Sequence, residues 1–456
     1  MKKKVIIAGA GMGNPAGMTS ELLLALEKAE LIIGPARLVR PFQEEGRKVF
    51  CEYRADRILS AVEKAEENRI LILVSGDQGF FSAAERIVRL LSSFHPQVLP
   101  GISSVAYFSA KIGVPYSSAC IRSAHGRSLN IASVVRRNRV SFILAGGNLQ
   151  ELLKTLCRFG YPDVEVYTGE ELSYETEKIR CGTAMELAGG GGNCLSAGRD
   201  WTDDVNPSGS GQEKDSFSSL SLMAVINPEA EEAVPFGIPD GEFIRGTVPM
   251  TKREARSLIL SSLKLRADSV VVDIGAGTGS VSVEAALSAY KGTVYAVERK
   301  KEALELIHSN AIRFHTDNLR IIEGEAPEAL HGLPPAEAYF IGGTGGRMGE
   351  ILDYLKEKVC KCTCGQGSDC PESFPDPDRS PEMTSENGCR VVISASTLQT
   401  LTETQQLLHE KQFRNIFFTQ IQASRSQKVG RYDFMKAENP VFVITAEMER
   451  NKAHYG

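Results

Sequence analysis

The residues best suited to bind a ligand form a glycine-rich loop between two acids. The string DIGAGTG runs from Asp273 to Gly279 after an apolar run, and Glu298 ends the next apolar run. A dinucleotide-binding loop, G-x-G-x-x-G, holds a pyrophosphate against its amides, and a carboxylate beside it would repel that group. The same carboxylate suits a cationic group, while Glu298 stands about 20 residues downstream, where an acid commonly meets ribose hydroxyls. The pattern predicts an S-adenosylmethionine site, with a ligand-free strand-to-helix turn as the alternative.

A second glycine-rich loop lies near the N-terminus and has a different design. The string GAGMGNP, from Gly9 to Pro15, follows the apolar run Val5–Ala8. Pro15 and its neighbours prevent a helix from starting at once, so the chain must make a wider loop there. Thr19 then has the side chain to cap a helix over 20–29. Taken alone, this loop has a structural turn as its alternative; together with DIGAGTG it indicates a second nucleotide-like ligand.

The segments that must position these loops alternate between short apolar runs and helical patterns. That alternation is typical of an α/β protein, and in the second half it predicts a mostly parallel, doubly wound sheet. Ligand loops then lie at the carboxyl ends of the strands, so Gly342–Gly346, which also follows a strand, should face the same crevice as DIGAGTG. Ahead of that sheet, Thr251 and Glu254 are spaced as a capping box for a helix that runs to about 263.

Composition divides the chain into two domains. An acidic, proline-bearing segment over 229–240 is predicted to link a first domain over 1–228 to a second over 241–456. Residues 188–215 are rich in glycine and serine, and residues 361–387 are rich in proline, serine, aspartate and cysteine, so both are predicted to be flexible insertions. The cysteines of the second insertion lack a C-x-x-C pair, so we expect no metal, with a zinc or iron–sulfur site as the alternative.

The overall composition narrows the class of protein. With 42% hydrophobic and 24% charged residues, the 456-residue chain is typical of globular proteins. Its net charge of −5 argues against nucleic acid as the main partner. No apolar stretch approaches the ~18 residues of a membrane span, and the start of the chain lacks the cleavage-type region of a signal peptide. We therefore expect a cytoplasmic protein without a membrane or nucleic-acid partner.

With these motifs in view, the chain resembles, over nearly its full length, the decarboxylating precorrin-6Y C5,15-methyltransferases of cobalamin biosynthesis. Its first half resembles the C5-methylating branch of the tetrapyrrole methylases, and its second half resembles the C15-methylating, decarboxylating domain. The strings that carry the first resemblance are GAGMGNP, Ser75–Ser82, Pro100–Ser104, Ser123–Arg127 and Gly169–Ser173. Those that carry the second are Gly237–Asp240, Val248–Lys252, DIGAGTG, Glu323–Glu328 and Ile341–Gly346.

The resemblance implies a two-lobed tetrapyrrole methylase fold followed by a Rossmann-like, doubly wound class I methyltransferase domain, each using S-adenosylmethionine. It implies methylation of C5 and C15 of precorrin-6B or cobalt-precorrin-6B, decarboxylation of the C12 acetate, and a homo-oligomer. The cofactor-binding residues predicted in the first domain are Gly9, Gly11, Gly13, Gly76, Asp77, Phe80, Ser103 and Ser104. Those predicted in the second domain are Thr251, Asp273, Gly275, Ala276, Gly277, Thr278, Gly279, Glu298 and Ala326.

Methyl transfer to a ring carbon requires mainly that donor and acceptor be held together without water, so no nucleophilic side chain is predicted. The tetrapyrrole carries many carboxylates, for which guanidinium groups are the expected complement. The candidates for that role are Arg253, Arg256, Arg425 and Arg431, each with a solvated surface charge as the alternative. His125 is a candidate for proton transfer or substrate contact, with a structural hydrogen bond as the alternative.

Other functions are weighed against this one. Two methyltransferase domains could act on another small molecule or on RNA, although the acidic charge disfavours RNA. The spacing of DIGAGTG and the acid at Asp273 argue against a dinucleotide-dependent oxidoreductase. A binding module without turnover is the third alternative. The sequence does not decide whether the ring carries cobalt, which methylation comes first, or which group assists decarboxylation.

Overall fold

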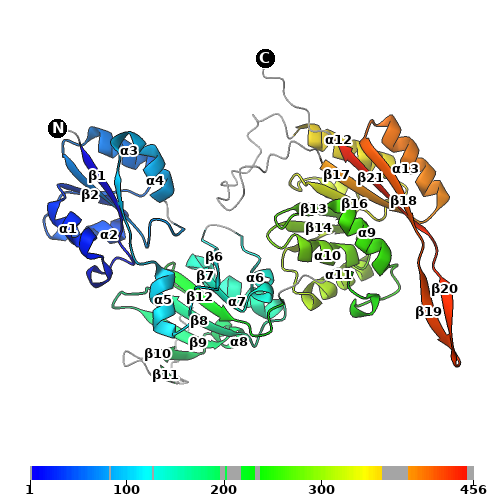
Figure 1. The fold of residues 1–456 in the computed structure, drawn as a ribbon, viewed down its shortest axis with the longest axis horizontal. Helices are drawn as coiled ribbons and strands as arrows, with labels where there is room; N and C mark the ends of the chain where they lie inside the picture. The colour runs from blue at the N-terminus through cyan, green and yellow to red at the C-terminus, as the bar shows by residue number, and fades with distance from the viewer. Residues whose placement is uncertain are drawn as a thin grey trace, which may run out of the picture. The chain divides into compact units, whose positions relative to one another are not determined.

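The computed structural model describes residues 3–81, 84–125, 128–195, 201–202, 217–231, 237–361 and 389–448 (Figure 1). The chain forms two compact units. Unit 1 comprises residues 1–129, 138–157 and 162–230, and unit 2 comprises residues 130–137, 158–161 and 231–456. Most of the two stretches predicted to be insertions, with Cys362, Cys364 and Cys370, lies outside the described residues.

Unit 1 contains a five-stranded parallel sheet that is covered on both faces. Its order is β3 (Val49–Cys51), β2 (Leu31–Gly34), β4 (Arg69–Val74), β1 (Lys4–Gly9) and β5 (Gln97–Leu99). Helices α1 (Ser20–Lys28) and α2 (Ala36–Glu44) pack on one face, and α3 (Ala55–Lys64) and α4 (Ala84–Leu90) pack on the other. Successive residues such as Ile32 and Ile33 therefore enter different cores, which explains the unbroken apolar runs. As predicted, Thr19 caps α1, because its hydroxyl accepts the amide of Leu22 at 3.3 Å.

The second sheet of unit 1 is mostly antiparallel. Its order is β11 (Trp201–Thr202), β10 (Asn193–Leu195), β9 (Lys178–Thr183), β8 (Glu165–Glu170), β12 (Ser221–Ile226), β7 (Val140–Leu144) and β6 (Cys120–Ser123). β6 and β7 run parallel, whereas the pairs from β7 to β11 are antiparallel. The connection 171–177 is too short for the crossover helix that parallel strands need. Helices α5 (Ser104–Ile112), α7 (Leu149–Arg158) and α8 (Ala184–Ala188) complete this part of the unit.

Unit 2 is built on the doubly wound sheet that the sequence predicts. Its order is β15 (Leu319–Glu323), β14 (Thr293–Glu298), β13 (Val270–Ile274), β16 (Ala338–Ile341), β17 (Cys389–Ala395), β21 (Val441–Met448) and β18 (Arg414–Ile421). The pairs from β15 to β17 are parallel, and β21 runs antiparallel to both of its neighbours. The order of the strands reverses between β13 and β16, which is the place where such sheets bind ligands at their carboxyl ends.

Helices cover both faces of this sheet. Helices α9 (Arg253–Leu263), α10 (Ser280–Ser288) and α11 (Lys301–Arg313) pack on one face, and α12 (Met348–Lys361) and α13 (Leu398–Glu410) pack on the other. Unit 2 also includes α6 (Ile131–Arg137), which lies far before the predicted linker in the sequence. The buried carboxylate of Asp317 accepts the amides of Ala132 and Ser133 at 2.8 and 3.2 Å. Burial raises the pKa of Asp317 to about 6.

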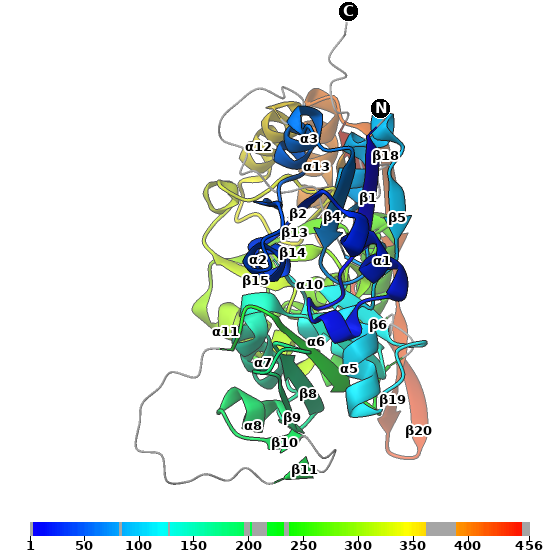
Figure 2. The same cartoon turned by 90° about the vertical axis from the view of Figure 1, so that its left-hand side faces the viewer.

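A two-stranded ribbon extends from the edge of the unit 2 sheet (Figures 1 and 2). It consists of β19 (Ser424–Val429) and β20 (Tyr432–Ala437), which pair only with each other among the described strands. All six residues of β20 are exposed. The ribbon continues the direction of β18 and β21, so it is anchored at one end only.

The capping box predicted at the start of α9 is wrong. Lys252 occupies the N-cap position, and no side chain caps the helix there. Glu254 pairs with Arg425 instead, and the Thr251 carbonyl accepts a hydrogen bond from Nη1 of Arg256 at 2.7 Å. A charge-assisted contact with a guanidinium is stronger than the capping bond that Glu254 would otherwise make.

Arg256 is fully buried and ties the start of unit 2 to α10. Its Nε donates to Glu284 at 2.5 Å, and its Nη1 lies 3.3 Å from Asp240. The Glu284 carboxylate also accepts the amides of Gly237 and Ile238, both at 3.0 Å. Because no part of Arg256 is exposed, it offers nothing to a substrate, which corrects its candidate role in binding a substrate carboxylate.

Replacing Arg256 with alanine should lower the free energy of unfolding of unit 2 by about 3–5 kcal/mol, because the buried Glu284 carboxylate would lose its counter-charge. Replacing the exposed Arg253 with alanine should change the same free energy by less than about 0.5 kcal/mol. Scanning calorimetry of the full chain, which resolves transitions of separate units, measures both. Equal effects of the two variants would contradict the structural role of Arg256.

Candidate functional site

In unit 2, the loop after β13 meets the loop after β16 through main-chain atoms. Gly275 has a φ of +72°, and a Cβ built on it would lie 2.6 Å from the carbonyl oxygen of Gly343. A side chain at Gly275 would therefore push the two loops apart. The DIGAGTG loop and the Gly342–Gly346 loop lie side by side, as the sequence predicts.

Glu298, at the end of β14, is fixed against the same loop. Its Oε2 accepts the amide of Gly277 at 2.9 Å, and its Oε1 accepts the amides of Arg299 and Lys300 at 2.8 and 3.0 Å. A carboxylate has about four lone-pair positions, so it can still accept hydroxyl groups. The spacing between DIGAGTG and Glu298 thus corresponds to a direct contact between them.

Asp273, the first residue of DIGAGTG, is buried beneath the loop. Its Oδ2 accepts the hydroxyl of Ser282, while its Oδ1 has no hydrogen-bond partner within the described part of the chain. Burial raises the pKa of Asp273 to about 7, and the nearby charge of Glu298 adds to the rise. The hydroxyl of Thr278 is also buried without a partner there. Unsatisfied buried polar atoms are costly, so these two fit a site that a polar ligand completes.

The other residues predicted for this site surround the loop. The segment before α9 lies over Gly277, since a Cβ there would be 3.2 Å from the carbonyl oxygen of Pro249. Thr251, at the end of that segment, is half-buried. Ala326, which follows β15, is buried, and Ala276 is half-buried. Gly279 packs on α11, with Ile307 about 3.1 Å from where its Cβ would be.

In unit 1, three strand ends meet at Gly9, Gly76 and Gly101. A Cβ on Gly101 would lie 2.3 Å from the carbonyl oxygen of Gly76, and one on Gly9 would lie 2.6 Å from the same oxygen. Gly11 and Gly76 form a bridge with bonds of 3.2 and 2.7 Å. Asp77 joins the same loops, because its carboxylate accepts the amides of Gly79 and Gly101 at 2.9 and 3.1 Å.

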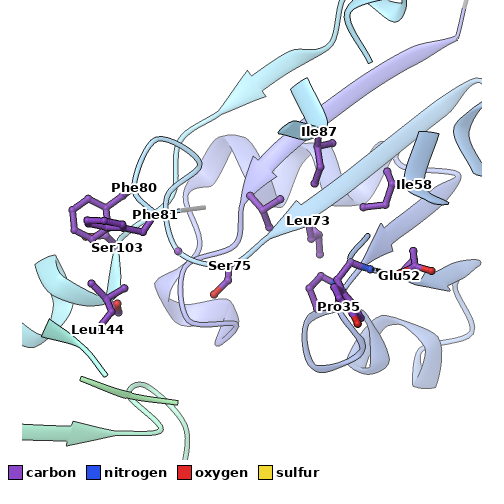
Figure 3. Close-up of a pocket in the computed structure, with 14 residues that line it drawn as sticks. Pro35, Glu52, Ile58, Leu73, Ser75, Phe80, Phe81, Ile87, Ser103 and Leu144 are labelled. Carbon is purple, nitrogen blue, oxygen red and sulfur yellow. Dashed lines mark hydrogen bonds between the residues drawn. The ribbon is translucent and has the colours of Figure 1, made fainter. Parts of the chain in front are cut away.

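A cavity of about 200 Å³ opens beside these strand ends (Figure 3). Figure 3 shows Phe80, Phe81 and Ser103 at one side of it, Pro35 and Glu52 at the other, and Ser75 between them. Four of the residues predicted to bind the cofactor line the cavity, namely Gly76, Phe80, Ser103 and Ser104. The residues Gly9, Gly11, Gly13 and Asp77 are not among its lining residues.

Sequence reasoning missed several lining residues, among them Pro35, Glu52 and Tyr53. Pro35 directly follows β2, and Glu52 directly follows β3. The rule that ligands gather at the carboxyl ends of parallel strands is the signal that would have found both. Two backbone amides hold the pKa of Glu52 below its usual range, those of Arg54 and Tyr53.

Of the remaining charged candidates, the three arginines lie in unit 2 and His125 lies in unit 1. Arg425 pairs with Asp240 at 3.1 Å and with Glu254, so protein carboxylates already neutralise it. Arg431 lies in the turn of the ribbon, where its Nη2 donates to the hydroxyl of Tyr432 at 2.7 Å. Arg253 is exposed. The ring of His125 packs on Gly146, whose Cβ would lie 2.5 Å from Nδ1.

Two general features concern metals and membranes. Among the residues with described positions, no group of three or more histidine, cysteine, aspartate or glutamate side chains could hold a metal ion. No helix in the described ranges is long and apolar enough to cross a membrane.

The sequence matches two families of known proteins. Residues 4–188 match the tetrapyrrole (corrin/porphyrin) methylases, and residues 243–361 match the precorrin methyltransferase domain. A probable cobalt-precorrin-6B C(15)-methyltransferase (decarboxylating) from Pyrobaculum calidifontis is 40% identical over 213 residues, which are 46% of this chain and 95% of the relative. The cobalt-precorrin-6B C(15)-methyltransferase (decarboxylating) of Salmonella typhimurium is 35% identical over 213 residues, which are 46% of this chain and 96% of the relative. The crystal structure of precorrin-6Y C5,15-methyltransferase from Geobacter metallireducens is 30% identical and covers 47% of this chain and 98% of its own, with a TM-score of 0.39.

Replacing Asp273 with asparagine should make stability less dependent on pH. The pKa of this carboxyl is about 7 when folded, against 3.8 ordinarily, so the folded state holds a proton that the unfolded state releases. Wild-type stability then falls as pH rises from about 4 to about 7, and the neutral amide avoids this loss. Relative to the wild type, the variant should gain up to about 4 kcal/mol between pH 4 and 8, measured by denaturant unfolding. A difference that stays constant with pH would contradict the raised pKa.

Proposed function

Because the chain belongs to the precorrin methyltransferase family, we propose that it transfers methyl groups from S-adenosylmethionine to C5 and C15 of precorrin-6B or cobalt-precorrin-6B and removes carbon dioxide from the C12 acetate. The observation that carries this proposal is the presence of two separate glycine loops. Each lies at the carboxyl edge of a parallel sheet, one in each unit. Two independent cofactor sites on one chain suit an enzyme that methylates two positions of the same ring.

We assign the two methylations to different halves of the chain. The first domain, over 1–228, would methylate C5, and the second, over 241–456, would methylate C15 and decarboxylate. The names of the relatives support the second assignment, since they describe C(15)-methyltransferases that are decarboxylating. The match of residues 4–188 to tetrapyrrole methylases supports a ring substrate for the first domain.

Bound S-adenosylmethionine supplies an electrophilic methyl group on a sulfonium. In unit 2, the glycines at Gly275, Gly277 and Gly279 let the main chain approach the cofactor closely. Glu298 would accept its ribose hydroxyls, and the unpartnered oxygen of Asp273 would face its cationic end. A nearby cation favours the ionised form of Asp273, so binding would release a proton at pH values below about 7.

In unit 1, Gly76, Phe80, Ser103 and Ser104 would hold the cofactor. The Oγ of Ser103 accepts the amide of Ala106 at 3.1 Å, which fixes its position while leaving its proton free to donate. Neither unit would need a nucleophilic side chain, because the ring carbon would attack the methyl carbon while the methyl–sulfur bond breaks and S-adenosylhomocysteine leaves. The protein's contribution is to align the two reactants and to exclude water.

Another small molecule or RNA as the methyl acceptor is the alternative function. The net charge of −5 disfavours RNA, since binding to nucleic acid rests on cationic contacts with phosphates. A cytoplasmic location and a homo-oligomeric state are part of the same proposal.

The proposed function predicts a defined change in the mass of the ring. Incubating the purified chain with S-adenosylmethionine and precorrin-6B, with and without cobalt, should add two methyl groups and remove carbon dioxide, as measured by mass spectrometry. The variant Asp273→Ala should add only the C5 methyl group, because the second cofactor site would lose the acid beneath its loop. Asp268→Ala removes a half-buried acid in the turn before β13, which pairs with Arg266 at 3.3 Å and lies outside the glycine loops. It is the matched control and should behave as wild type. An unmodified ring would contradict the function, and loss of both methylations in folded Asp273→Ala would contradict the division of labour.

The ribbon of unit 2 predicts how copies of the chain associate. Val429 pairs with Tyr432, and Phe434 lies on the same face of β20 as Tyr432, so the three exposed apolar side chains form one strip. A two-stranded ribbon is marginally stable in water without a partner. We expect a second copy to cover this strip, and light scattering should then give a mass above the monomer's. Phe434→Glu should reduce that mass, whereas Leu398→Glu, an exposed apolar site on α13, should not. A monomeric wild type would contradict this.

A further inference from the structure

Arg37 lies where three loops of the first site converge. Its Nη1 donates to the carbonyl of Met12 at 3.0 Å and to the hydroxyl of Tyr174 at 3.1 Å. Its Nη2 donates to the hydroxyl of Ser75. Met12 belongs to the GAGMGNP loop, Ser75 follows β4, and Tyr174 lies between β8 and β9 of the other sheet of unit 1. One guanidinium on α2 therefore joins both lobes of this unit.

The positive charge of Arg37 is not neutralised by the protein. All three of its acceptors are neutral oxygens, and no carboxylate pairs with it in the ranges that the structure describes. Arg256 and Arg425 differ in this respect, because both pair with Asp240. A guanidinium has five N–H donors, so Arg37 keeps donors for a further acceptor. Arg37 is half-buried, and a charge partly removed from water is stabilised by an opposite charge.

Arg37 also stands at the edge of the cavity. Its partner Ser75 lines the cavity, as does Pro35 two residues before it. The acid that lines the same cavity, Glu52, is already held by the amides of Tyr53 and Arg54 at 2.8 and 3.0 Å. At the edge of the cavity, the guanidinium of Arg37 therefore has no counter-charge among the described residues, whereas the carboxylate of Glu52 already accepts two backbone amides.

We propose that Arg37 binds a carboxylate of the ring substrate at the first site. This rests on the proposed function, in which the first domain acts on a ring that carries many carboxylates. A guanidinium binds a carboxylate through two parallel hydrogen bonds, which fixes the direction of the bound group as well as its position. Since Arg37 also holds the three loops, a carboxylate bound there sets the ring in register with the residues that line the cavity.

The test compares three variants of Arg37 and its surroundings in the full-length chain. Arg37→Gln should raise the KM for the ring in C5 methylation by roughly ten- to hundredfold, the usual effect of losing one hydrogen-bonded charge. Arg37→Lys should lower that KM part of the way back, because lysine keeps the positive charge but cannot form two parallel hydrogen bonds. Tyr174→Phe removes one of the three hydrogen bonds that Arg37 donates and leaves the charge of Arg37, so it should change that KM by less than about threefold. Arg40→Gln, on the exposed side of α2, is the matched control.

Two further readouts separate substrate binding from a loss of structure. In Arg37→Gln the KM for S-adenosylmethionine in C5 methylation should rise far less than the KM for the ring, because the loops lose only bonds to neutral oxygens whereas the ring loses a bond between opposite charges. The rate of C15 methylation by the same molecules should stay within about twofold of wild type. Equal rises in the two KM values, with Arg37→Lys as impaired as Arg37→Gln, would show a purely structural clamp and overturn the proposal. A wild-type chain that methylates C15 but not C5 would overturn the function assigned to the first domain and this proposal together.

Discussion

The close approach of main chains at glycine residues is the constraint on which both sites depend. In unit 1 a Cβ on Gly101 would lie 2.3 Å from a carbonyl oxygen, and in unit 2 one on Gly275 would lie 2.6 Å from one. Because the loops meet at glycines, no side chain covers their backbone amides, and these amides can donate to nearby carboxylates. The amide of Gly101 donates to Asp77, and that of Gly277 donates to Glu298. The ends of the parallel strands therefore set the geometry of each site.

Features that depend on nearby residues could be predicted from the sequence. The strand, the glycines and the acid of DIGAGTG are contiguous, and the contact with Glu298 follows from one strand-helix-strand repeat. The doubly wound sheet of unit 2 and the Thr19 cap follow from equally local patterns. In unit 1, Gly76, Phe80, Ser103 and Ser104 were identified from the resemblance to a family, and the structure brings these four to one cavity.

Features that depend on distant residues could not be predicted. Glu254 fails to complete a capping box because Arg425, which follows it by 171 positions, competes for its carboxylate. The carboxylate of Asp317 accepts an amide of α6 that lies 185 positions earlier in the sequence. No local sequence pattern therefore predicts that α6 belongs to unit 2. The helical spacing of Arg256 with Ile259 and Leu263 places it on the buried face of α9, but its partner Glu284 lies on another helix, so no local pattern identifies that partner. Pairings of this kind are decided by the tertiary fold, because a buried charge must find a partner wherever one is available.

The charge of a side chain does not by itself identify a binding residue. A charged side chain is a better candidate when no other protein group already pairs with it. The proposed cofactor is cationic and the proposed ring is anionic, so a charge that the protein has not already paired is the better candidate for binding either of them. In unit 2 the acid is Asp273, which burial keeps protonated until a cation or a higher pH ionises it. In unit 1 the acid Asp77 is held by amides, and the guanidinium of Arg37 meets only neutral oxygens among the described residues. A net charge of −5 gives an anionic ring no long-range attraction to the chain, and salt screens charges beyond about 10 Å, so the proposed recognition rests on cations close to the bound ring.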